Sequence, residues 1–392
     1  MKNLQDLKDL KNKKVLLRLD LNVPLKDEII EDETRINKIL PVLKFLLKAN
    51  SKIIIVSHIG RPKGKINPKL SLKPICKNLE NKLNEKIKLI SEDLRQIDKT
   101  DLFKNRSENI LVFENIRFYL EEEKNDLEFS KNLASFADIY INDAFSCSHR
   151  AHASVVNITK FLPSYPGLQF SSEIEALKKI TVNIESPVTC IIGGSKISTK
   201  IEIIKNLIPK FDNIIIVGAM ANNILRYKNF SVGKSIYEKN YNNIIKNIFE
   251  ISNKHSCSIV YPDDVVTGKN VNSEPIVKEL KNIQDSDMIL DIGPKTIKKI
   301  NDIINSSKTV LWNGPAGYFE NPSFAKGSYE IAKSIVRKYK KDSLYSVAGG
   351  GDTIAILNKV NAIHNFNFVS TAGGAFLEYL EGKKLPGISA LN

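Results

Sequence analysis

Short runs of apolar residues alternate with amphipathic stretches along the whole chain, and this alternation limits the fold more than any other feature. Stretches with helical spacing of apolar residues lie at 34–49, 200–208 and 240–253. The apolar runs have the length of strands and lie at residues 14–20, 52–57, 110–113, 138–142, 188–193, 213–218, 258–261, 287–291, 308–312, 344–348 and 366–369. Repeated strand–helix units favour parallel sheets with helices on both faces. We therefore predict an α/β protein with doubly wound, Rossmann-like sheets.

A chain of 392 residues is longer than one hydrophobic core usually supports, so we expect two domains. Two prolines and a glycine interrupt the pattern at residues 162–167, and a capped helical pattern begins directly afterwards. We predict an N-terminal domain at 1–168, a C-terminal domain at 169–375 and a bridging helix at about 171–182.

Several classes of protein do not fit the composition. The basic start of the chain is not followed by an apolar run, so we expect no secretory signal. No segment approaches the roughly 20 apolar residues that a membrane span needs. The cysteines at 76, 147, 190 and 257 are scattered without metal-ligand spacing, which favours reduced thiols and a cytoplasmic protein.

The charge is strongly basic, with 58 Lys and Arg against 44 Asp and Glu and a net charge of +14. Such a balance suggests anionic ligands, and a nucleic-acid binder is one alternative. The lysines, however, form neither a stripe nor a tail. Only nine of the basic residues are arginine, and seven of these lie in the first 150 residues. Because arginine grips carboxylate and phosphate with two parallel hydrogen bonds, we expect an oxyanion site in this half.

Polar side chains follow the strands of the first half where each strand ends. In the strand at 14–20, one face changes from Leu16 to Arg18, Asp20 and Asn22. Since ligands bind at the carboxyl ends of parallel strands, we expect the polar residues of this half to face one crevice. They are Arg18, Arg35, Arg61, Arg117 and Arg150, with His58 and either His149 or His152. Their ligand should be small and highly anionic.

The second half repeats a strand–glycine–helix pattern three times. The three segments are Ile191-Ile-Gly-Gly-Ser-Lys-Ile-Ser-Thr-Lys200, Ser346-Val-Ala-Gly-Gly-Gly-Asp-Thr353 and Ser370-Thr-Ala-Gly-Gly-Ala375. Backbone N–H groups at such helix starts bind phosphate, and an aspartate beside phosphates is typical of a Mg²⁺ site. The sequence Gly233-Lys-Ser is not a P-loop, because residue 228 is lysine rather than the required glycine. We predict a nucleoside triphosphate site.

An anion site and a nucleotide site together suggest direct phosphoryl transfer, which depends mainly on positioning and charge neutralisation. The two sites would have to close on each other to exclude water. Two other classes remain open at this point. One is a non-catalytic binder of polyanions or nucleic acid, and the other is a Rossmann dehydrogenase, which would need a strand-linked Gly-x-Gly-x-x-Gly that this chain lacks.

The chain resembles the phosphoglycerate kinase family over nearly its whole length. The motifs that carry the resemblance are Arg18-Leu-Asp-Leu-Asn-Val-Pro, Ser57-His-Ile-Gly-Arg-Pro, Glu114-Asn-Ile-Arg-Phe, His149-Arg-Ala-His, Gly193-Gly-Ser-Lys-Ile-Ser-Thr-Lys, Asp291-Ile-Gly-Pro, Trp312-Asn-Gly-Pro-Ala-Gly-Tyr-Phe-Glu, Gly349-Gly-Gly-Asp-Thr and Leu385-Pro-Gly-Ile. The resemblance implies reversible, Mg²⁺-dependent transfer between ATP and 3-phospho-D-glycerate, giving ADP and 1,3-bisphosphoglycerate.

The resemblance also implies roles for individual residues. Asp20 and Asn22, with Arg35, would hold the glycerate end of the substrate. The 3-phosphate would be bound by His58, Arg61, Arg117 and Arg150. The transferring phosphoryl group would be neutralised by Arg35 and Lys196 and by the amides near Gly350, Gly351, Gly373 and Gly374. The nucleotide would be bound by Lys196, Lys200, Asn313, Glu320, Gly349, Gly350, Gly351, Asp352 and Thr353, with Asp352 also holding Mg²⁺.

Members of this family have two doubly wound domains that move about a hinge, and a C-terminal tail that returns to the first domain. The resemblance implies that residues 376–392 form this tail. We expect a cytoplasmic monomer that acts in glycolysis and binds neither membrane nor nucleic acid. Ser146, Val217 and Ala372 stand where the family commonly has glycine. None of these three departures removes a charged group, so we expect activity to be retained.

Overall fold

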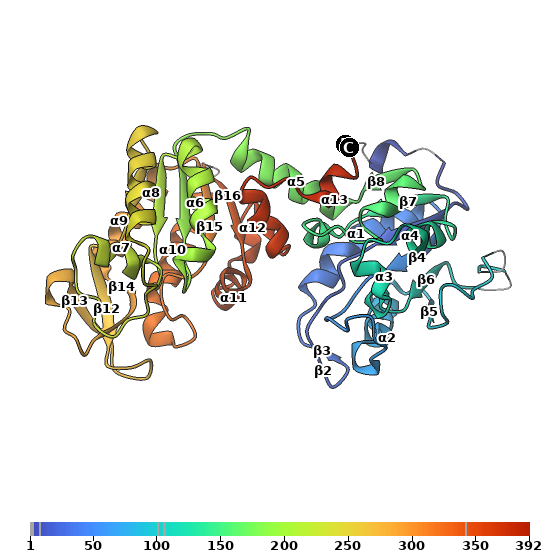
Figure 1. Ribbon diagram of the computed structural model, residues 1–392, viewed down its shortest axis with the longest axis horizontal. Coiled ribbons are helices and arrows are strands. Elements are labelled where there is room, and N and C mark those ends of the chain that lie inside the picture. Colours follow the sequence, from blue (N-terminus) through green and yellow to red (C-terminus); the bar gives the residue numbers. More distant parts are fainter. Residues whose placement is uncertain (1–3, 8, 100–101, 105–106, 342) are drawn as a thin grey trace. The chain divides into compact units, whose positions relative to one another are not determined.

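The computed structural model describes residues 4–7, 9–99, 102–104, 107–341 and 343–392. The chain forms two compact units (Figure 1). The first consists of Met1–Glu175 with Lys384–Asn392, and the second of Ala176–Lys383. The division lies within helix α5 (Leu168–Thr181), so that this helix belongs to both units.

The first unit contains a six-stranded parallel sheet with the strand order β5-β6-β4-β1-β7-β8. Its strands are β1 (Lys14–Arg18), β4 (Lys52–Val56), β5 (Ile87–Ile90), β6 (Ile110–Phe113), β7 (Ile139–Asn142) and β8 (Ser164–Pro166). Its helices are α1 (Thr34–Lys48), α2 (Lys73–Leu83), α3 (Leu120–Glu123), α4 (Leu127–Ala134) and α13 (Pro386–Ser389). A short ribbon is formed by β2 (Leu25–Lys26) and β3 (Ile29–Ile30).

Helices cover both faces of this sheet. Successive side chains of a strand point to opposite faces, and β1 has apolar residues on both of them. Val15 and Leu17 face one core, where they lie with apolar residues of α1 and α2. Leu16 faces the other core, together with residues of α4. Arg18 continues the face of Leu16 and is fully buried. Among the four buried residues of β1, Arg18 at the carboxyl end is therefore the polar one.

The second unit contains another six-stranded parallel sheet, in the order β11-β10-β9-β15-β16-β17. Its strands are β9 (Val188–Ile192), β10 (Asn213–Ile216), β11 (Ser258–Val260), β15 (Thr309–Asn313), β16 (Tyr345–Gly349) and β17 (Phe368–Ser370). Its helices are α6 (Ile201–Leu207), α7 (Ala221–Tyr227), α8 (Asn242–Lys254), α9 (Pro294–Ser306), α10 (Lys326–Tyr339), α11 (Gly351–Lys359) and α12 (Gly374–Leu380). The predicted fold class, two parallel-sheet α/β domains, is thus confirmed.

One predicted strand lies outside the parallel sheet. The run at 287–291 forms β14 (Met288–Ile292), but it pairs antiparallel with β12 (Asp264–Gly268), which also pairs with β13 (Ile276–Glu279). In Figure 1 these three strands lie together, apart from β15 and β16. Antiparallel neighbours need only a short connection, so this small sheet forms without crossover helices. The strands β2, β3, β5, β8, β12 and β13 were not predicted.

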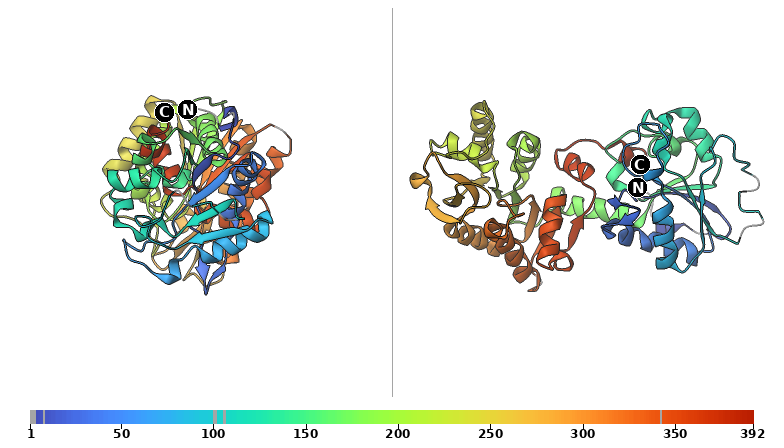
Figure 2. Two further views of the ribbon diagram at one scale, coloured as in Figure 1. Left: turned by 90° about the vertical axis from the view of Figure 1, so that its right-hand side faces the viewer. Right: turned by 90° about the horizontal axis from the view of Figure 1, so that it is seen from below.

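The end of the chain returns to the first unit at Lys384. The amide of Gly387 donates to the carbonyl oxygen of Ser148 at 2.9 Å, and a Cβ at residue 387 would lie 2.8 Å from the Ser148 Cα. The right-hand view of Figure 2 shows this red segment among blue and green elements of the first unit. Helix α12 stays with the second unit, where Asn206 donates to the carbonyl oxygen of Leu380 at 2.7 Å.

Among the residues described here, none of the helices combines the length and apolar content needed to cross a membrane.

Candidate active site

The polar residues of the first unit follow four neighbouring strands at one edge of the sheet. Strands β6, β4, β1 and β7 are adjacent and parallel, so their carboxyl ends share this edge. Arg18 ends β1, His58 and Arg61 follow β4, Arg117 follows β6, and Arg150 follows β7. The topology brings together residues that are far apart in the sequence.

Asp20 is the centre of a group of short contacts. Its Oδ2 lies 3.1 Å from Nη1 of Arg35, which also donates to the carbonyl oxygen of Asn22 at 2.8 Å. The Ser146 hydroxyl donates to the same Oδ2 at 2.5 Å. Sequence reasoning treated Ser146 only as a loop residue and missed this contact. Its position directly after a strand of the same edge was the available signal.

A second set of contacts joins Arg117 to this group. The Asn22 side-chain oxygen accepts from the amide of Gly60 at 2.9 Å, and Arg117 Nη1 donates to the Gly60 carbonyl at 2.9 Å. Arg117 Nε also lies 3.6 Å from a carboxylate oxygen of Glu123. The loop after β4 is therefore tied to the loops after β1 and β6.

The remaining predicted residues differ in exposure. Arg61 and Arg150 are exposed, and Arg150 Nε lies 3.2 Å from Nε2 of His149. His58 and His152 are buried. Burial and nearby arginines lower the pKa of His58 well below its ordinary value and that of His152 to about 3. The positive charge of this edge therefore comes from guanidinium groups rather than from histidines.

The glycine turns of the second unit lie at the carboxyl ends of β9, β16 and β17. Gly350 has a φ of 98° and precedes α11, and Gly373 has a φ of 55° and precedes α12. These positive φ values favour glycine, which leaves the first N–H groups of each helix accessible. Lys196 is exposed beside the turn after β9. At these turns a glycine with positive φ thus precedes a helix start, the arrangement from which the sequence analysis predicts a nucleoside triphosphate site.

Hydrogen bonds connect the turns to one another. Lys200 Nζ donates to the side-chain oxygen of Asn313, whose amide nitrogen donates to the Gly349 carbonyl at 2.6 Å. The Thr353 hydroxyl accepts from the amide of Gly314 at 2.8 Å. Partial burial lowers the pKa of Lys200 from its ordinary value. Strands β9, β15 and β16 thus carry one continuous polar network at their ends.

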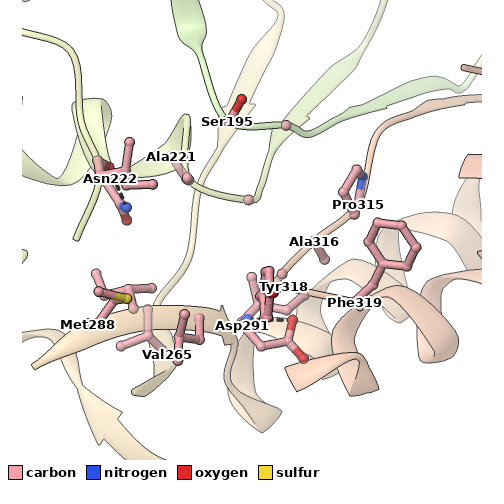
Figure 3. Close-up of a pocket in the computed structure, with 18 of the residues that line it drawn as sticks. Ser195, Ala221, Asn222, Val265, Met288, Asp291, Pro315, Ala316, Tyr318 and Phe319 are labelled. Carbon is pink, nitrogen blue, oxygen red and sulfur yellow. Dashed lines mark hydrogen bonds between the residues drawn. The ribbon is translucent and has the colours of Figure 1, made fainter. Parts of the chain in front are cut away.

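A cavity of about 330 Å³ opens beside this network (Figure 3). Its walls are mainly apolar. Val265 and Met288 lie on one side of it, and Pro315 and Phe319 lie on another. Such a volume and lining are typical of sites for small organic ligands. The cavity is suited to a flat, largely apolar group such as a nucleobase.

Three acidic residues also line this cavity. Glu320 and Asp352 are two of the nucleotide ligands that the family resemblance implies, with Asp352 also implied as the ligand of Mg²⁺. The third, Asp291, is buried and accepts hydrogen bonds from the amides of Gly327 and Ile292, at 2.7 and 2.9 Å. Burial raises the pKa of Asp291 to about 7. Asp291 therefore holds the local backbone in place. The sequence analysis named it only as the first residue of a family motif and gave it no role.

The three departures from glycine are accommodated without strain. Ser146 lies in a 3-10 helix, Phe145–Cys147, whose backbone is right-handed. At the other two turns the positive φ falls on the next residue, Gly218 at 68° and Gly373 at 55°, rather than on Val217 or Ala372. The serine, valine and alanine therefore need no unusual backbone conformation.

Comparison with known proteins relates the chain to one family. The sequence model of the family described as phosphoglycerate kinase matches residues 4–383. A phosphoglycerate kinase of Wolbachia pipientis wMel is 46% identical over 385 residues, covering 98% of this chain and 96% of the relative. One of Orientia tsutsugamushi (strain Ikeda) is 44% identical over 397 residues, covering 100% and 98%.

Solved structures give the same result. The phosphoglycerate kinase of Coxiella burnetii superposes with a TM-score of 0.91 at 35% identity, covering 100% of this chain and 98% of that chain. The enzyme of Pyrococcus horikoshii OT3 superposes with a TM-score of 0.83 at 28% identity and the same coverage. Since the match extends over nearly all of the sequence, the chain belongs to the phosphoglycerate kinase family.

Proposed function

We propose that the protein catalyses the reversible reaction of ATP with 3-phospho-D-glycerate, giving ADP and 1,3-bisphosphoglycerate. The observation that carries this proposal is the pair of sites described above. One sheet ends in arginines around Asp20, and the other ends in glycine turns beside a cavity for a nucleobase. Family membership supplies the identity of the acceptor, a carboxyl group.

In the first unit, the substrate is bound by its two ends. Asp20 and Asn22 bind the hydroxyl and carboxyl end, where Arg35 is already within 3.1 Å of Asp20. The 3-phosphate is bound by His58, Arg61, Arg117 and Arg150. Two of these arginines are exposed and give charge that a ligand can reach. The planar guanidinium groups fix the orientation of the phosphate.

In the second unit, the cavity binds the nucleobase, and Glu320 binds the ribose hydroxyls. Lys196, Lys200 and the N–H groups of the turns at Gly350 and Gly373 bind the phosphates. A carboxylate oxygen of phosphoglycerate attacks the γ-phosphorus, and the bond from that phosphorus to the β,γ-bridging oxygen breaks. ADP leaves with the bond electrons, and no covalent enzyme intermediate forms. Arg35 and Lys196 offset the charge of the transferring group.

The donor set in the second unit fits Mg²⁺. This ion usually keeps several waters and takes one or two carboxylates together with phosphate oxygens. Asp352 lies in the first turn of α11 and lines the cavity, whereas no cluster of three or more His, Cys, Asp or Glu ligands occurs in the described part of the chain. Asp352 would hold the ion, which neutralises charge on the β- and γ-phosphates when bound.

Replacing Asp352 by asparagine should raise the KM for MgATP at least about tenfold, because the variant loses the anionic metal ligand. The KM for 3-phosphoglycerate should change little. Steady-state kinetics at varied free Mg²⁺ measure both values. Asp302→Asn, at an exposed aspartate on α9, is the matched control and should behave as wild type. An Asp352→Asn enzyme with unchanged Mg²⁺ dependence would argue against this assignment.

The activity is tested by a coupled assay with glyceraldehyde-3-phosphate dehydrogenase and NADH. Purified protein should form ADP from ATP, and oxidise NADH through the coupling enzyme, only when 3-phosphoglycerate is present. ATP hydrolysis that is independent of 3-phosphoglycerate, or no turnover with both substrates at millimolar concentration, contradicts the proposal.

The nucleic-acid alternative is not supported by the family, the relatives or the solved structures. The one observation that suggests it is the net charge of +14. It requires tight DNA or RNA binding that weakens steeply with salt. We expect filter binding at moderate salt to detect none.

We also propose that the enzyme acts as a monomer in the cytoplasm, where its small substrates are found. Sedimentation equilibrium gives the mass in solution, which should match the 44.1 kDa of one chain.

A further inference from the structure

Arg18 is a fully buried arginine whose N–H groups are directed at acceptors of its own chain. Nε donates to the hydroxyl of Ser154 at 2.9 Å, and Nη1 donates to the carbonyl oxygen of Leu19. Nη2 lies 3.1 Å from Nδ1 of His58 and 3.6 Å from Sγ of Cys147. A guanidinium has five N–H donors and no acceptor. Four of the five are accounted for, so Arg18 acts on neighbouring side chains rather than on a bound anion.

We infer that Arg18 is a positioning residue that holds His58 as a neutral ring with its single proton on Nε2. Arginine can only donate, so Nδ1 of His58 must be the acceptor in their contact. A protonated imidazole would place a second donor against the guanidinium. Because the neutral ring has one proton, that proton lies on Nε2, which is the nitrogen left to donate to a ligand.

The groups around His58 favour the same state. Arg18 at the end of β1 and Cys147 after β7 contact its Nδ1, and Arg35 on α1, Arg117 after β6 and His152 after β7 influence its pKa. The three arginines are cations, and burial together with them lowers the pKa of His58 well below its ordinary value. The pKa of His152 is lowered to about 3, and burial raises the pKa of the Cys147 thiol. His152 therefore stays neutral and Cys147 stays a thiol between pH 6 and 8.

The consequence for ligand binding rests on the proposed function, whereas the tautomer does not. If His58 donates to the 3-phosphate from a neutral ring, phosphoglycerate binding gains no strength from histidine protonation. The second pKa of a phosphate monoester is near 6, so its second negative charge forms as the pH rises from 6 to 8. Affinity should therefore rise or stay level from pH 6 to 8. A cationic His58 with an ordinary pKa of about 6.5 would instead make affinity fall through that window.

Nitrogen-15 NMR of the histidine rings tests the tautomer directly. The chain has five histidines, so His58 can be assigned with one His58→Gln sample. In ¹⁵N-histidine-labelled wild type, we expect His58 to be protonated at Nε2 only, without titrating from pH 5.5 to 8. A ring protonated at Nδ1, or one that titrates near pH 6.5, would overturn the inference. Arg18→Met removes the donor that makes Nδ1 the acceptor, so His58 in that variant should show protonation at Nδ1 as well as at Nε2.

Two substitutions of His58 test its donor atom. The amide nitrogen of glutamine can reach the place of Nε2, whereas that of asparagine reaches only the place of Nδ1. Calorimetry with 3-phosphoglycerate at pH 6, 7 and 8 should show His58→Gln within about threefold of wild type and His58→Asn at least about tenfold weaker. Equal losses in both variants, or better binding by asparagine, would contradict a donor at Nε2.

His149→Gln is the control for a second histidine of the same edge, because any titration of His149 disappears in it. The two kinds of measurement also separate the inference from the proposed function. A wild type that shows the Nε2 tautomer but binds no 3-phosphoglycerate would refute the function and leave the role of Arg18 intact. The opposite result would be a wild-type affinity for 3-phosphoglycerate that falls from pH 6 to 8, with a pH dependence that disappears in His58→Gln. That result would refute the neutral ring and leave the function intact.

Discussion

Replacing Arg35 by alanine should lower kcat at least about a hundredfold, the loss typical of removing one charged donor from a developing anion. Arg35 is the only basic residue of the first unit to which we give two roles, binding substrate and neutralising the transferring group. It is held in place by Asp20 at 3.1 Å and by the Asn22 carbonyl at 2.8 Å. Steady-state kinetics in the coupled assay measure the effect.

The fold should survive this substitution, because the Arg35 side chain is 29% exposed and partly solvated ion pairs contribute little to stability. Arg95→Ala is the matched control. Arg95 is also paired with an aspartate of the same unit, Asp93 at 2.6 Å, but its ion-pair partners, Asp93 and Glu121, are not among the proposed substrate-binding residues. Arg35→Lys keeps the charge without the planar fork and should fall between the two. A fully active Arg35→Ala enzyme would contradict the proposal that Arg35 neutralises the transferring phosphoryl group.

The parts of the fold that could be predicted depend on local periodicity. β1, β4 and β9 are buried and flanked by helices with one apolar face, so their sequences contain the signal. β13 could not be found this way, since its first two residues, Ile276 and Val277, are exposed hydrophobic residues. β8 includes Pro166, and its sequence suggests an interruption of the strand–helix pattern rather than a strand. It nevertheless pairs with β7 at the edge of the sheet, where proline is tolerated.

The site could be predicted as far as topology alone determines it. Because parallel strands end at one edge, Arg18, His58 and Arg117 had to come together there, whatever their separation in the sequence. Individual contacts lie beyond such reasoning. The bond from Ser146 to Asp20 joins residues 126 positions apart, and a rotamer rather than a motif decides it. The same holds for the contact between Arg18 and Nδ1 of His58.

Gly314→Ala should destabilise the second unit by about 3 kcal/mol and abolish nucleotide binding. Gly314 has a φ of 102°, where a side chain is strained, and a Cβ there would lie 2.2 Å from the carbonyl oxygen of Gly193. The atoms that this Cβ would meet belong to the backbone of Gly193, so no side chain can move to relieve the contact. The loops after β9 and β15 must separate, and this disrupts the turn that holds Lys196.

The single tryptophan of the chain reports this change. Trp312 is buried, and its indole nitrogen donates to the Gly314 carbonyl at 2.9 Å. Its fluorescence should shift in Gly314→Ala, and thermal unfolding followed at this residue should begin at lower temperature. Gly351→Ala is the matched control, because nothing lies within 4 Å of a Cβ at that position. It should therefore be nearly as stable as wild type. If both variants were equally stable, close contact between the two glycine loops could not be what shapes the nucleotide site.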